Sequence, residues 1–282
     1  MTQDIGIMQK RNGWPQLFEY MPRIGIIGLG FVGSAIKDNY NDYSLYLIDT
    51  DLSKGYTDTY EDIKDAEGIF VCVPSPQNAD GSCNSTILEN VLKNLKDYKG
   101  VIISKVTATP NVYERLQLEY PNLVYVPEFL TAANASADYA KENWAVIGGS
   151  TLAYQREADR IIHYTKPTVD SVYCSIGEAS MVKYIINSFL ATKVVFMNEM
   201  CQLSEAKGYS WNKIRGMISK DPRVNISHTQ VPGPDDYYGF GGMCFPKDTN
   251  ALVSYAENLN INLNVLKEAI KKNTLLRLHK PK

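Results

Sequence analysis

Residues 239–250, GFGGMCFPKDTN, combine side chains that could do covalent chemistry. Pro246 suits the first turn of a helix, where its missing N–H costs nothing. Cys244 would then lie at the N-terminus of that helix, where unpaired amides, the helix dipole and Lys247 favour a thiolate. Asp248 follows about one helical turn later and can face the same site. The segment therefore predicts an activated nucleophile with an acidic partner, although an isolated cysteine in a glycine-rich turn is more often a buried structural residue.

A glycine fingerprint far upstream favours the functional interpretation. Gly28-x-Gly30-x-x-Gly33 follows the strand-like stretch RIGIIG and precedes a segment with helical spacing. In this context the first two glycines let the backbone approach a pyrophosphate, and the third permits close packing of helix on strand. Asp49 ends the next expected strand, where a carboxylate receives a ribose 2′-hydroxyl and would repel a 2′-phosphate. We therefore expect NAD rather than NADP, and Lys54 is the only nearby residue that argues the other way.

The rest of the first half alternates strand-like and helical segments. Further strands are expected in the short apolar runs at 68–73, 101–104, 123–126 and 145–147. This order is typical of an α/β protein with a parallel, doubly wound sheet of Rossmann type, which binds ligands beyond the carboxyl ends of its strands. Those ends are followed by VPSP at 73–76, KVTATP at 105–110 and VPEFL at 126–130. The residues expected to bind NAD are Gly28, Gly30, Phe31, Val32, Gly33, Asp49, Val73, Pro74, Ser75 and Lys247.

From about Ser175 the pattern becomes helical. The expected helices are one long helix at 176–207 and shorter ones at 210–219, 247–258 and 263–276. Lys183 and Asn187 share one face of the long helix. Such a pair can be structural, but beside a nucleotide it can hold and polarise a substrate oxygen. We expect three regions: an extension of unclear role at 1–21, an NAD-binding domain at 22–174, and a helical dimerisation domain with the cysteine loop at 175–282.

The composition excludes several classes of protein. The 282 residues include 29 Lys and Arg against 31 Asp and Glu, a net charge of −2, so there is no electrostatic case for a nucleic-acid partner. No apolar run is expected to cross a membrane, and the N-terminus lacks the pattern of a signal peptide. The five cysteines have no Cys-x-x-Cys spacing, and the three histidines lack metal-ligand or triad spacing. These features predict a reduced, cytoplasmic protein without a structural metal.

With these segments in order, the chain resembles the UDP-glucose/GDP-mannose dehydrogenase family over roughly residues 22–275. The matching pieces, in family order, are GLGFVG with Asp49, VPSP followed by DGS, KVTATPNVYERL, PEFL, the long helix, DPRV and GFGGMCFPKD. The last of these is highly specific. The resemblance implies an NAD-dependent, four-electron oxidation of the C6 alcohol of a nucleotide sugar to a uronic acid, in the first instance UDP-glucose to UDP-glucuronate.

The resemblance also implies roles for the candidate residues. Lys183 and Asn187 stabilise the oxygen at C6 while the alcohol is oxidised to an aldehyde. Cys244 then attacks the aldehyde and forms a thiohemiacetal, whose oxidation leaves a thioester. Without the cysteine, an enzyme of this kind should stall at the aldehyde.

Hydrolysis of the thioester uses three further residues in the family. Water is positioned by Thr107 and Asp248 and activated by Glu128. The family usually has a second glutamate where this chain has Ala132, so that part of the acid–base network is in question. The implied substrate-binding residues are Glu128, Phe129, Leu130, Lys183, Asn187, Arg223, Tyr238 and Gly241.

The chain ends where the family's central helical domain ends, so we expect the family's C-terminal domain to be absent. Its loss would weaken the grip on the nucleotide or require a separate partner chain that supplies the domain. Arg223 implies a dimer, since in the family this residue reaches into the site of a neighbouring subunit. We therefore expect a homodimer joined through the long helix.

Several alternatives to the oxidation of UDP-glucose stay open. A sibling enzyme would act on GDP-mannose or a UDP-N-acetylhexosamine. A simple hydroxyacid dehydrogenase could share the layout and the pair Lys183 and Asn187, but it has no use for Cys244 and Glu128. A truncated NAD-binding module could act through another protein, although it would have no need to keep all the catalytic residues.

Overall fold

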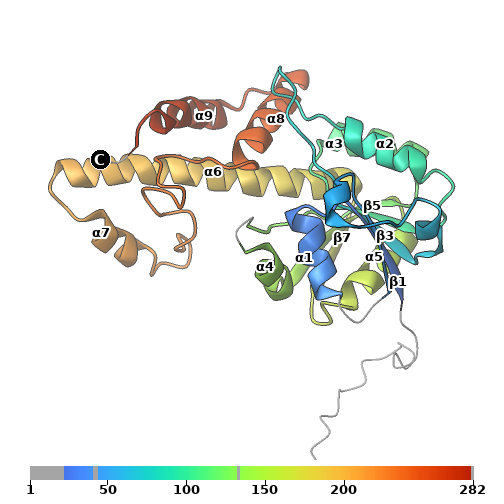
Figure 1. Ribbon diagram of the computed structural model, residues 1–282. Helices are drawn as coiled ribbons and strands as arrows, with labels where there is room; N and C mark the ends of the chain where they lie inside the picture. The colour runs from blue at the N-terminus through green and yellow to red at the C-terminus, as the bar shows by residue number, and fades with distance from the viewer. Residues whose placement is uncertain (1–21, 41–43, 132–133, 281–282) are drawn as a thin grey trace, which may run out of the picture.

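The computed structural model describes residues 22–40, 44–131 and 134–280 (Figure 1). The expectations for residues 1–21 and for Ala132 lie outside these ranges. The described chain forms a sheet half and a helical half, joined by one long helix, α6 (Ile176–Ala206). Figure 1 shows α6 running from the sheet at one end of the molecule towards the small helix α7 (Trp211–Ile218) at the other.

The sheet contains seven strands among the described residues, in the order β2-β1-β3-β4-β5-β6-β7. They are β1 (Arg23–Ile27), β2 (Ser44–Ile48), β3 (Gly68–Val71), β4 (Val101–Ser104), β5 (Leu123–Tyr125), β6 (Trp144–Gly148) and β7 (Asp170–Cys174). The pairs from β2 to β5 are parallel, as the alternation of strands and helices requires. The carboxyl ends of these five strands therefore share one edge of the sheet, called here the carboxyl edge.

β6 departs from the predicted all-parallel arrangement, because it pairs antiparallel with β5 through Tyr125 and Gly148. β7, a strand that the sequence pattern did not predict, pairs in parallel with β6 and ends with Cys174 opposite Gly148. The start of α6, directly after β7, therefore lies level with the end of β5. The second and third turns of α6 consequently pass the carboxyl edge.

Helices cover both faces of the sheet, which confirms the α/β fold predicted above. One core includes Leu116 and Ile176 under α2, α3 and the start of α6, and the other includes Ile36 and Ile161 under α1, α4 and α5. The helices of the sheet half are α1 (Phe31–Asn39), α2 (Thr86–Asn94), α3 (Pro110–Glu119), α4 (Ala135–Lys141) and α5 (Leu152–His163), with short 3-10 turns η1 (Leu52–Lys54) and η2 (Asp62–Asp65).

α6 begins where the sequence predicts, because Ser175 and Glu178 form a capping box. Ser175 Oγ accepts the Glu178 N–H at 3.2 Å, and Glu178 Oε2 accepts the Ser175 N–H at 2.8 Å. Gly148 lets the helix approach β6, since a Cβ there would lie 2.9 Å from the Cα of Ile176. Ser180 Oγ donates to a carbonyl of the loop after β4 at 2.7 Å. These contacts fix the first turns of α6 against β6 and the loop after β4.

Contrary to the expectation that no segment reaches membrane-spanning length, α6 is long and apolar enough to cross a membrane by length and composition. In the fold, 44% of its most apolar window is buried. It contacts β5, β6 and α3 in the sheet half and α8 (Phe245–Asn258) and α9 (Asn264–Arg277) in the helical half. These are the contacts of a core helix that joins the two halves.

α8 and α9 pack against α6 and build the core of the helical half (Figure 1). Tyr184 of α6 is fully buried in this core with Leu252 of α8 and Leu266 of α9. The bounds of α7, α8 and α9 agree with the expected ranges to within two residues at each end. The packing of α8 on α6 brings the cysteine loop, which precedes α8, to the face of α6 that carries the lysine and the asparagine.

Candidate active site

The glycine loop between β1 and α1 is shaped to receive a phosphate. Gly28 has φ +91°, a left-handed value that favours glycine, and a Cβ on Gly33 would lie 1.9 Å from the Gly28 carbonyl oxygen. Gly30, the N-cap of α1, has no atom within 4 Å of the position of a Cβ. Phe31 and Val32 form the first turn of α1. The open side of Gly30 and the free amides of this turn suit a pyrophosphate.

Asp49 lies at the end of β2, beside this loop. Its Oδ2 accepts the Leu29 N–H at 2.6 Å and its Oδ1 accepts the Asp51 N–H at 2.8 Å, while Lys54 Nζ lies 2.8 Å from Oδ2. Burial opposes ionisation, but the hydrogen bonds from Lys54 and the two amides lower the pKa of Asp49 overall. An ionised carboxylate beside Gly30 fits the adenine ribose of NAD and disfavours a 2′-phosphate.

Lys247 links the helical half to the loop that follows β3. Val73, Pro74 and Ser75 form that loop at the carboxyl edge, and Ser75 is buried. Lys247 Nζ donates to Ser75 Oγ at 3.4 Å and to Asp248 Oδ1 at 2.5 Å. A cation of α8 therefore lies between the predicted cofactor loop and the predicted acidic partner of the cysteine.

Lys183, in the second turn of α6, meets the loop that follows β5. Its Nζ donates to the carbonyl oxygen of Glu128 and lies 3.2 Å from Oε1 of the same residue, and the two side chains are 4% and 7% exposed. Glu128 Oε2 accepts the Leu130 N–H at 2.8 Å, and the centre of the Phe129 ring lies 5.2 Å from Lys183 Nζ. Residues predicted from separate segments thus form a buried ion pair at the carboxyl edge.

Asn187, one turn further along α6, contacts Asp248 of α8. Asn187 Nδ2 donates to Asp248 Oδ2 at 2.6 Å, and the Asp248 side chain is 1% exposed. Because Lys183 and Asn187 lie one turn apart on the same face, the contacts Lys183–Glu128 and Asn187–Asp248 lie next to each other. The structure therefore brings four of the predicted catalytic residues into one buried polar cluster.

Cys244 is the N-cap residue of α8, with Pro246 in the first turn, as predicted. Its thiol is half-buried. Burial and the Asp248 charge raise the pKa of Cys244, while Lys183 and Lys247 act in the opposite direction. The expectation of an environment that favours the thiolate was therefore wrong for the free chain, because burial and a neighbouring carboxylate outweigh the two lysines.

Thr107 lies in the loop after β4 and is buried. Its carbonyl oxygen accepts a hydrogen bond from the Cys83 thiol at 3.5 Å. Burial raises the pKa of two fully buried tyrosines, Tyr125 and Tyr184, and a side-chain hydrogen bond with Thr107 works in the opposite direction at Tyr125. Sequence reasoning did not select these tyrosines, although Tyr184 directly follows Lys183 in the chain.

Two predicted substrate-binding residues lie outside the buried cluster. Arg223 is exposed after α7 and binds Asp221 with two hydrogen bonds of 3.0 and 2.6 Å. Gly241 lies beside Arg277, since a Cβ there would be 2.7 Å from Arg277 Nη2. Within the described part of one chain, the contacts of both residues are with groups other than Lys183 and Glu128.

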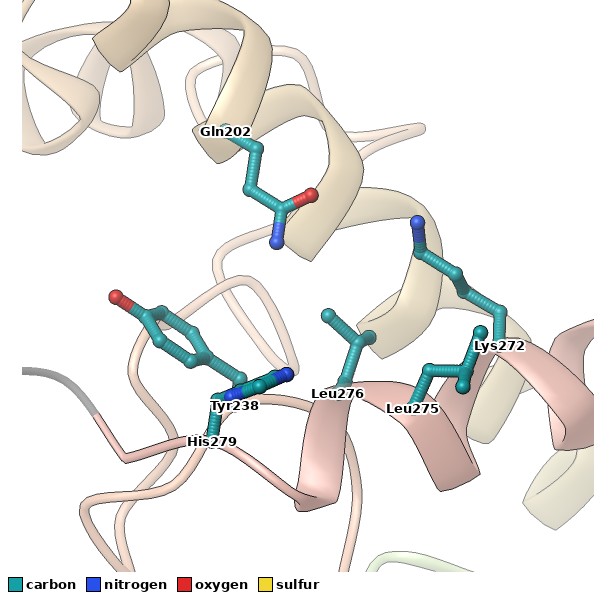
Figure 2. Close-up of a pocket in the computed structure, with 6 residues that line it drawn as sticks. All are labelled: Gln202, Tyr238, Lys272, Leu275, Leu276 and His279. Atoms are coloured by element: carbon teal, nitrogen blue, oxygen red, sulfur yellow. The ribbon is translucent and has the colours of Figure 1, made fainter.

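Tyr238 lines a separate hollow of about 340 Å³ near the C-terminal end of α6 (Figure 2). The lining residues are Gln202, Tyr238, Lys272, Leu275, Leu276 and His279. Gln202 lies 15 residues after Asn187 on the helix, a rise of about 22 Å. The structure therefore places Tyr238 away from the buried cluster of its own chain.

Two models of one protein family match the sequence of this chain. Residues 47–166 match the NAD binding domain, and residues 177–275 match the central domain, of the UDP-glucose/GDP-mannose dehydrogenase family. The chain belongs to this family. The NAD binding domain of the family corresponds to the sheet half of the structure, and the central domain corresponds to the helical half. The match to the NAD binding domain, together with the fit of the glycine loop and Asp49, identifies NAD as the cofactor of this family member.

Individual members of the UDP-glucose/GDP-mannose dehydrogenase family agree with this assignment. UDP-glucose 6-dehydrogenase YwqF of Bacillus subtilis is 31% identical over 221 residues, which are 74% of this chain and 48% of that protein. UDP-glucose dehydrogenase from Pyrobaculum islandicum has the same fold, with a TM-score of 0.78 and 22% identity over 93% of this chain and 70% of that one. UDP-D-ManNAc dehydrogenase from Pyrococcus horikoshii follows, with a TM-score of 0.74 and 21% identity over 90% and 68%. The chain spans about half the length of the curated relatives it matches.

Proposed function

We propose that this family member is an NAD-dependent nucleotide-sugar 6-dehydrogenase that oxidises a C6 alcohol to a carboxylate. The observation that carries the proposal is a buried polar cluster at the carboxyl edge, in which Lys183 contacts Glu128 and Asn187 contacts Asp248, while the Asp248 N–H donates to the Cys244 carbonyl oxygen at 2.8 Å. A single oxidation needs groups that hold the alcohol oxygen, but it needs no thiol. A cysteine beside those groups supports a reaction that continues past the aldehyde.

In the first oxidation Lys183 and Asn187 hold the oxygen at C6. The Lys183 ammonium has three N–H donors. Two of them contact Glu128, so one remains for a substrate oxygen. Asn187 is oriented by its bond to Asp248, so its position is fixed before substrate binds. Such fixed donors stabilise charge that develops on the oxygen. The glycine loop and Asp49 would hold NAD, which would supply the hydride acceptor for both oxidations.

The second oxidation begins with attack of Cys244 on the aldehyde carbon. A C–S bond forms, the carbonyl oxygen becomes a hydroxyl, and the thiol proton must leave the sulfur. Because the pKa of Cys244 is raised by burial and by Asp248, a base has to take this proton as the bond forms. Asp248, whose charge acts on the thiol, suits that role. Loss of the second hydride from the carbon and of the proton from the hydroxyl of the thiohemiacetal then leaves a thioester on Cys244.

Hydrolysis of the thioester returns the free thiol and releases the carboxylate. Glu128 is held by Lys183 and by the Leu130 N–H, so its carboxylate stays in one place and can accept a proton from water. Thr107 and Asp248 border the same cluster and position that water. One water is consumed, its oxygen enters the product, and the sulfur regains a proton.

UDP-glucose is the substrate we propose for this chemistry. The support is the name of two relatives, both UDP-glucose 6-dehydrogenases, which are 31% and 30% identical to this chain over the matched residues. GDP-mannose and a UDP-N-acetylhexosamine are the alternatives. Phe129 and Leu130 would contact the sugar nucleotide next to Glu128, and Arg223 would contact the substrate of a neighbouring subunit.

An exposed apolar stripe on α6 supports a homodimer. Ile185, Phe189, Phe196 and Leu203 are between 53% and 65% exposed and recur at intervals of four and seven residues along one side of the helix. Exposed apolar patches of this kind on a folded protein are typical of interaction sites. We propose that a second copy of the chain covers the apolar stripe.

Five free cysteines in the chain support a reducing compartment such as the cytoplasm.

The experiment that tests the proposal counts NADH molecules formed per sugar nucleotide consumed. UDP-glucose, GDP-mannose and UDP-N-acetylmannosamine are supplied separately to the purified chain with excess NAD. Two NADH per UDP-glucose, with a uronic acid as product, is the expected result. One NADH per substrate would instead support the single oxidation of a hydroxyacid-type dehydrogenase. No NADH from any of the three would support a non-catalytic NAD-binding module.

A further inference from the structure

Lys105, which directly follows β4, is a buried lysine without a carboxylate partner. The structure buries three lysines among its described residues, and the other two each contact a carboxylate. Lys166 lies beside Glu142, and Lys183 lies beside Glu128. Lys105 is 7% exposed and makes no ion pair within the described part of the chain. Burial of a charged group costs free energy and lowers the pKa of Lys105, so packing alone does not explain a lysine at this position.

The Lys105 side chain reaches the loop that carries Glu128. Its Nζ donates to the Pro127 carbonyl oxygen at 3.4 Å. Lys183 Nζ donates to the next carbonyl oxygen along the chain, that of Glu128. Two consecutive peptide groups are therefore each held by the side chain of a buried lysine.

The two lysines approach this loop from opposite faces of the sheet. Lys105 follows Val101 and Ile103 at intervals of two, and both of these residues belong to the core under α1, α4 and α5. The Lys105 N–H continues the hydrogen-bond ladder between β4 and β3, so the side chains at 101, 103 and 105 point to one face. Lys183 comes from α6, whose first turns pack in the core on the other face. The loop backbone is consequently held from both sides.

We propose that Lys105 is a positioning residue that holds the loop backbone at Glu128 in place for hydrolysis of the thioester. The position of the Glu128 carboxylate depends on the peptide groups on which its side chain stands. A shift of about 1 Å in a catalytic group can lower a rate about a hundredfold. Lys105 acts through the loop and complements Lys183 from the opposite face. Only the catalytic part of the proposal rests on the proposed function, since the hold on the loop does not depend on the reaction.

Hydrogen exchange of the purified chain tests the hold on the loop without substrate. Lys105→Met is expected to raise the exchange rate of the amides at 128–131 about tenfold, because the backbone loses one of its two supports. Lys105→Gln, which is polar but too short to reach the carbonyl, should give the same result. Lys193→Met is the matched control, since Lys193 Nζ donates at 2.7 Å to the Val224 carbonyl oxygen in another loop. The control should raise exchange at 224–227 and leave 128–131 unchanged. Unchanged exchange at 128–131 in either Lys105 variant would overturn the proposal.

Turnover and mass spectrometry of the intact protein test the positioning role. With UDP-glucose and NAD, Lys105→Met is expected to slow hydrolysis about tenfold, so that kcat falls and an acyl adduct on Cys244 accumulates. The ratio kcat/KM for UDP-glucose should change by less than about twofold, because it reports the steps before the thioester. Lys105→Arg, which keeps the N–H donors, should accumulate less adduct than Lys105→Met, and Lys193→Met should accumulate none.

A Lys105→Met variant that exchanges faster at 128–131 but accumulates no adduct would overturn the positioning role. A wild-type chain that forms no NADH would count against the proposed function alone, because the exchange comparison decides the hold on the loop independently.

Discussion

Lys183 Nζ contacts Glu128 at two points, the backbone carbonyl oxygen and, at 3.2 Å, the carboxylate Oε1. The second carboxylate oxygen accepts the Leu130 N–H at 2.8 Å. Both oxygens of Glu128 are therefore occupied by donors, and the carboxylate is held in one orientation by α6 and by its own loop. A general base must lie in a defined place, and these contacts hold the Glu128 carboxylate in one.

Breaking this pair should affect stability and activity in separable ways. Lys183→Met is expected to abolish turnover and to destabilise the protein by roughly 3–5 kcal/mol, because it leaves a buried carboxylate without its cation. The double variant Lys183→Met/Glu128→Gln should recover much of the stability but no activity. Urea denaturation and NADH formation measure the two effects. A stable and active Lys183→Met variant would contradict the assignment of Lys183.

Cys244→Ala should separate the two oxidations. The variant is expected to form no uronic acid, because no thioester can form without the thiol. Cys174→Ser, which changes a half-buried cysteine of β7, is the matched control and should still form two NADH per UDP-glucose. Product analysis by mass spectrometry gives the result. Uronate production by Cys244→Ala at the wild-type rate would exclude the covalent route.

The raised pKa of Cys244 predicts how the thiol reacts in the absence of substrate. Alkylation by iodoacetamide should be slow at pH 7–8 and should still rise with pH above 9, since the thiolate is the reactive form. Asp248→Asn removes a charge that raises this pKa and should accelerate alkylation at pH 8 by about three- to tenfold. Asp221→Asn, which changes the exposed ion pair with Arg223, is the control and should leave the alkylation rate of Cys244 unchanged. A rate that is already constant with pH below 8 would show that the thiolate is favoured after all.

Much of the fold could be predicted from local patterns. Ser175 and Glu178 mark the start of α6 because their capping contacts are local, and the glycine fingerprint marks the first turn of the sheet in the same way. β7 could not be predicted, because three of its five residues are exposed and the other two are half-buried, which leaves no buried apolar run. The reversed direction of β6 depends on its pairing with Tyr125, a contact between distant segments.

The site could be predicted as a set of residues but not as a network. Asn187 and Asp248 are 61 residues apart in the chain, and no spacing rule pairs them. The pKa of Cys244 was predicted in the wrong direction because reasoning about a helix terminus takes no account of burial by other elements. Arg223 and Tyr238 belong to a segment whose motif predicts substrate binding. The motif does not tell whether they contact the substrate of their own subunit or that of a neighbouring one.

The contact between Asp49 and Lys54 predicts the preference between NAD and NADP. The wild-type protein should bind NAD more tightly, because the Asp49 carboxylate, 9% exposed, would repel a 2′-phosphate. Asp49→Asn should reduce the ratio of the affinities for NAD and NADP. Lys54→Ala should widen it, because it removes the cation that offsets the repulsion. Dissociation constants from fluorescence titration supply the comparison, and equal affinity of the wild type for the two cofactors would exclude this role of Asp49.

The apolar stripe of α6 predicts the oligomeric state. The wild-type chain should be a dimer, and Phe189→Lys should shift it towards the monomer by placing a charge in the interface. Leu118→Lys is the control, since this residue of α3 is 87% exposed and lies outside the stripe. Light scattering after size-exclusion chromatography measures the mass. A monomeric wild-type chain would leave the stripe without the proposed occupant.

The unbroken course of α6 limits how this chain can change in length. Each residue added to an α-helix turns everything after it by about 100°. One residue inserted between Ser180, which is fixed on the loop after β4, and Lys183 would rotate the ammonium away from Glu128. The same insertion would rotate Asn187 and Phe189, so the site and the proposed subunit contact would be lost together. Insertions and deletions that preserve function are therefore expected in loops away from the site, and α6 should be inherited at constant length.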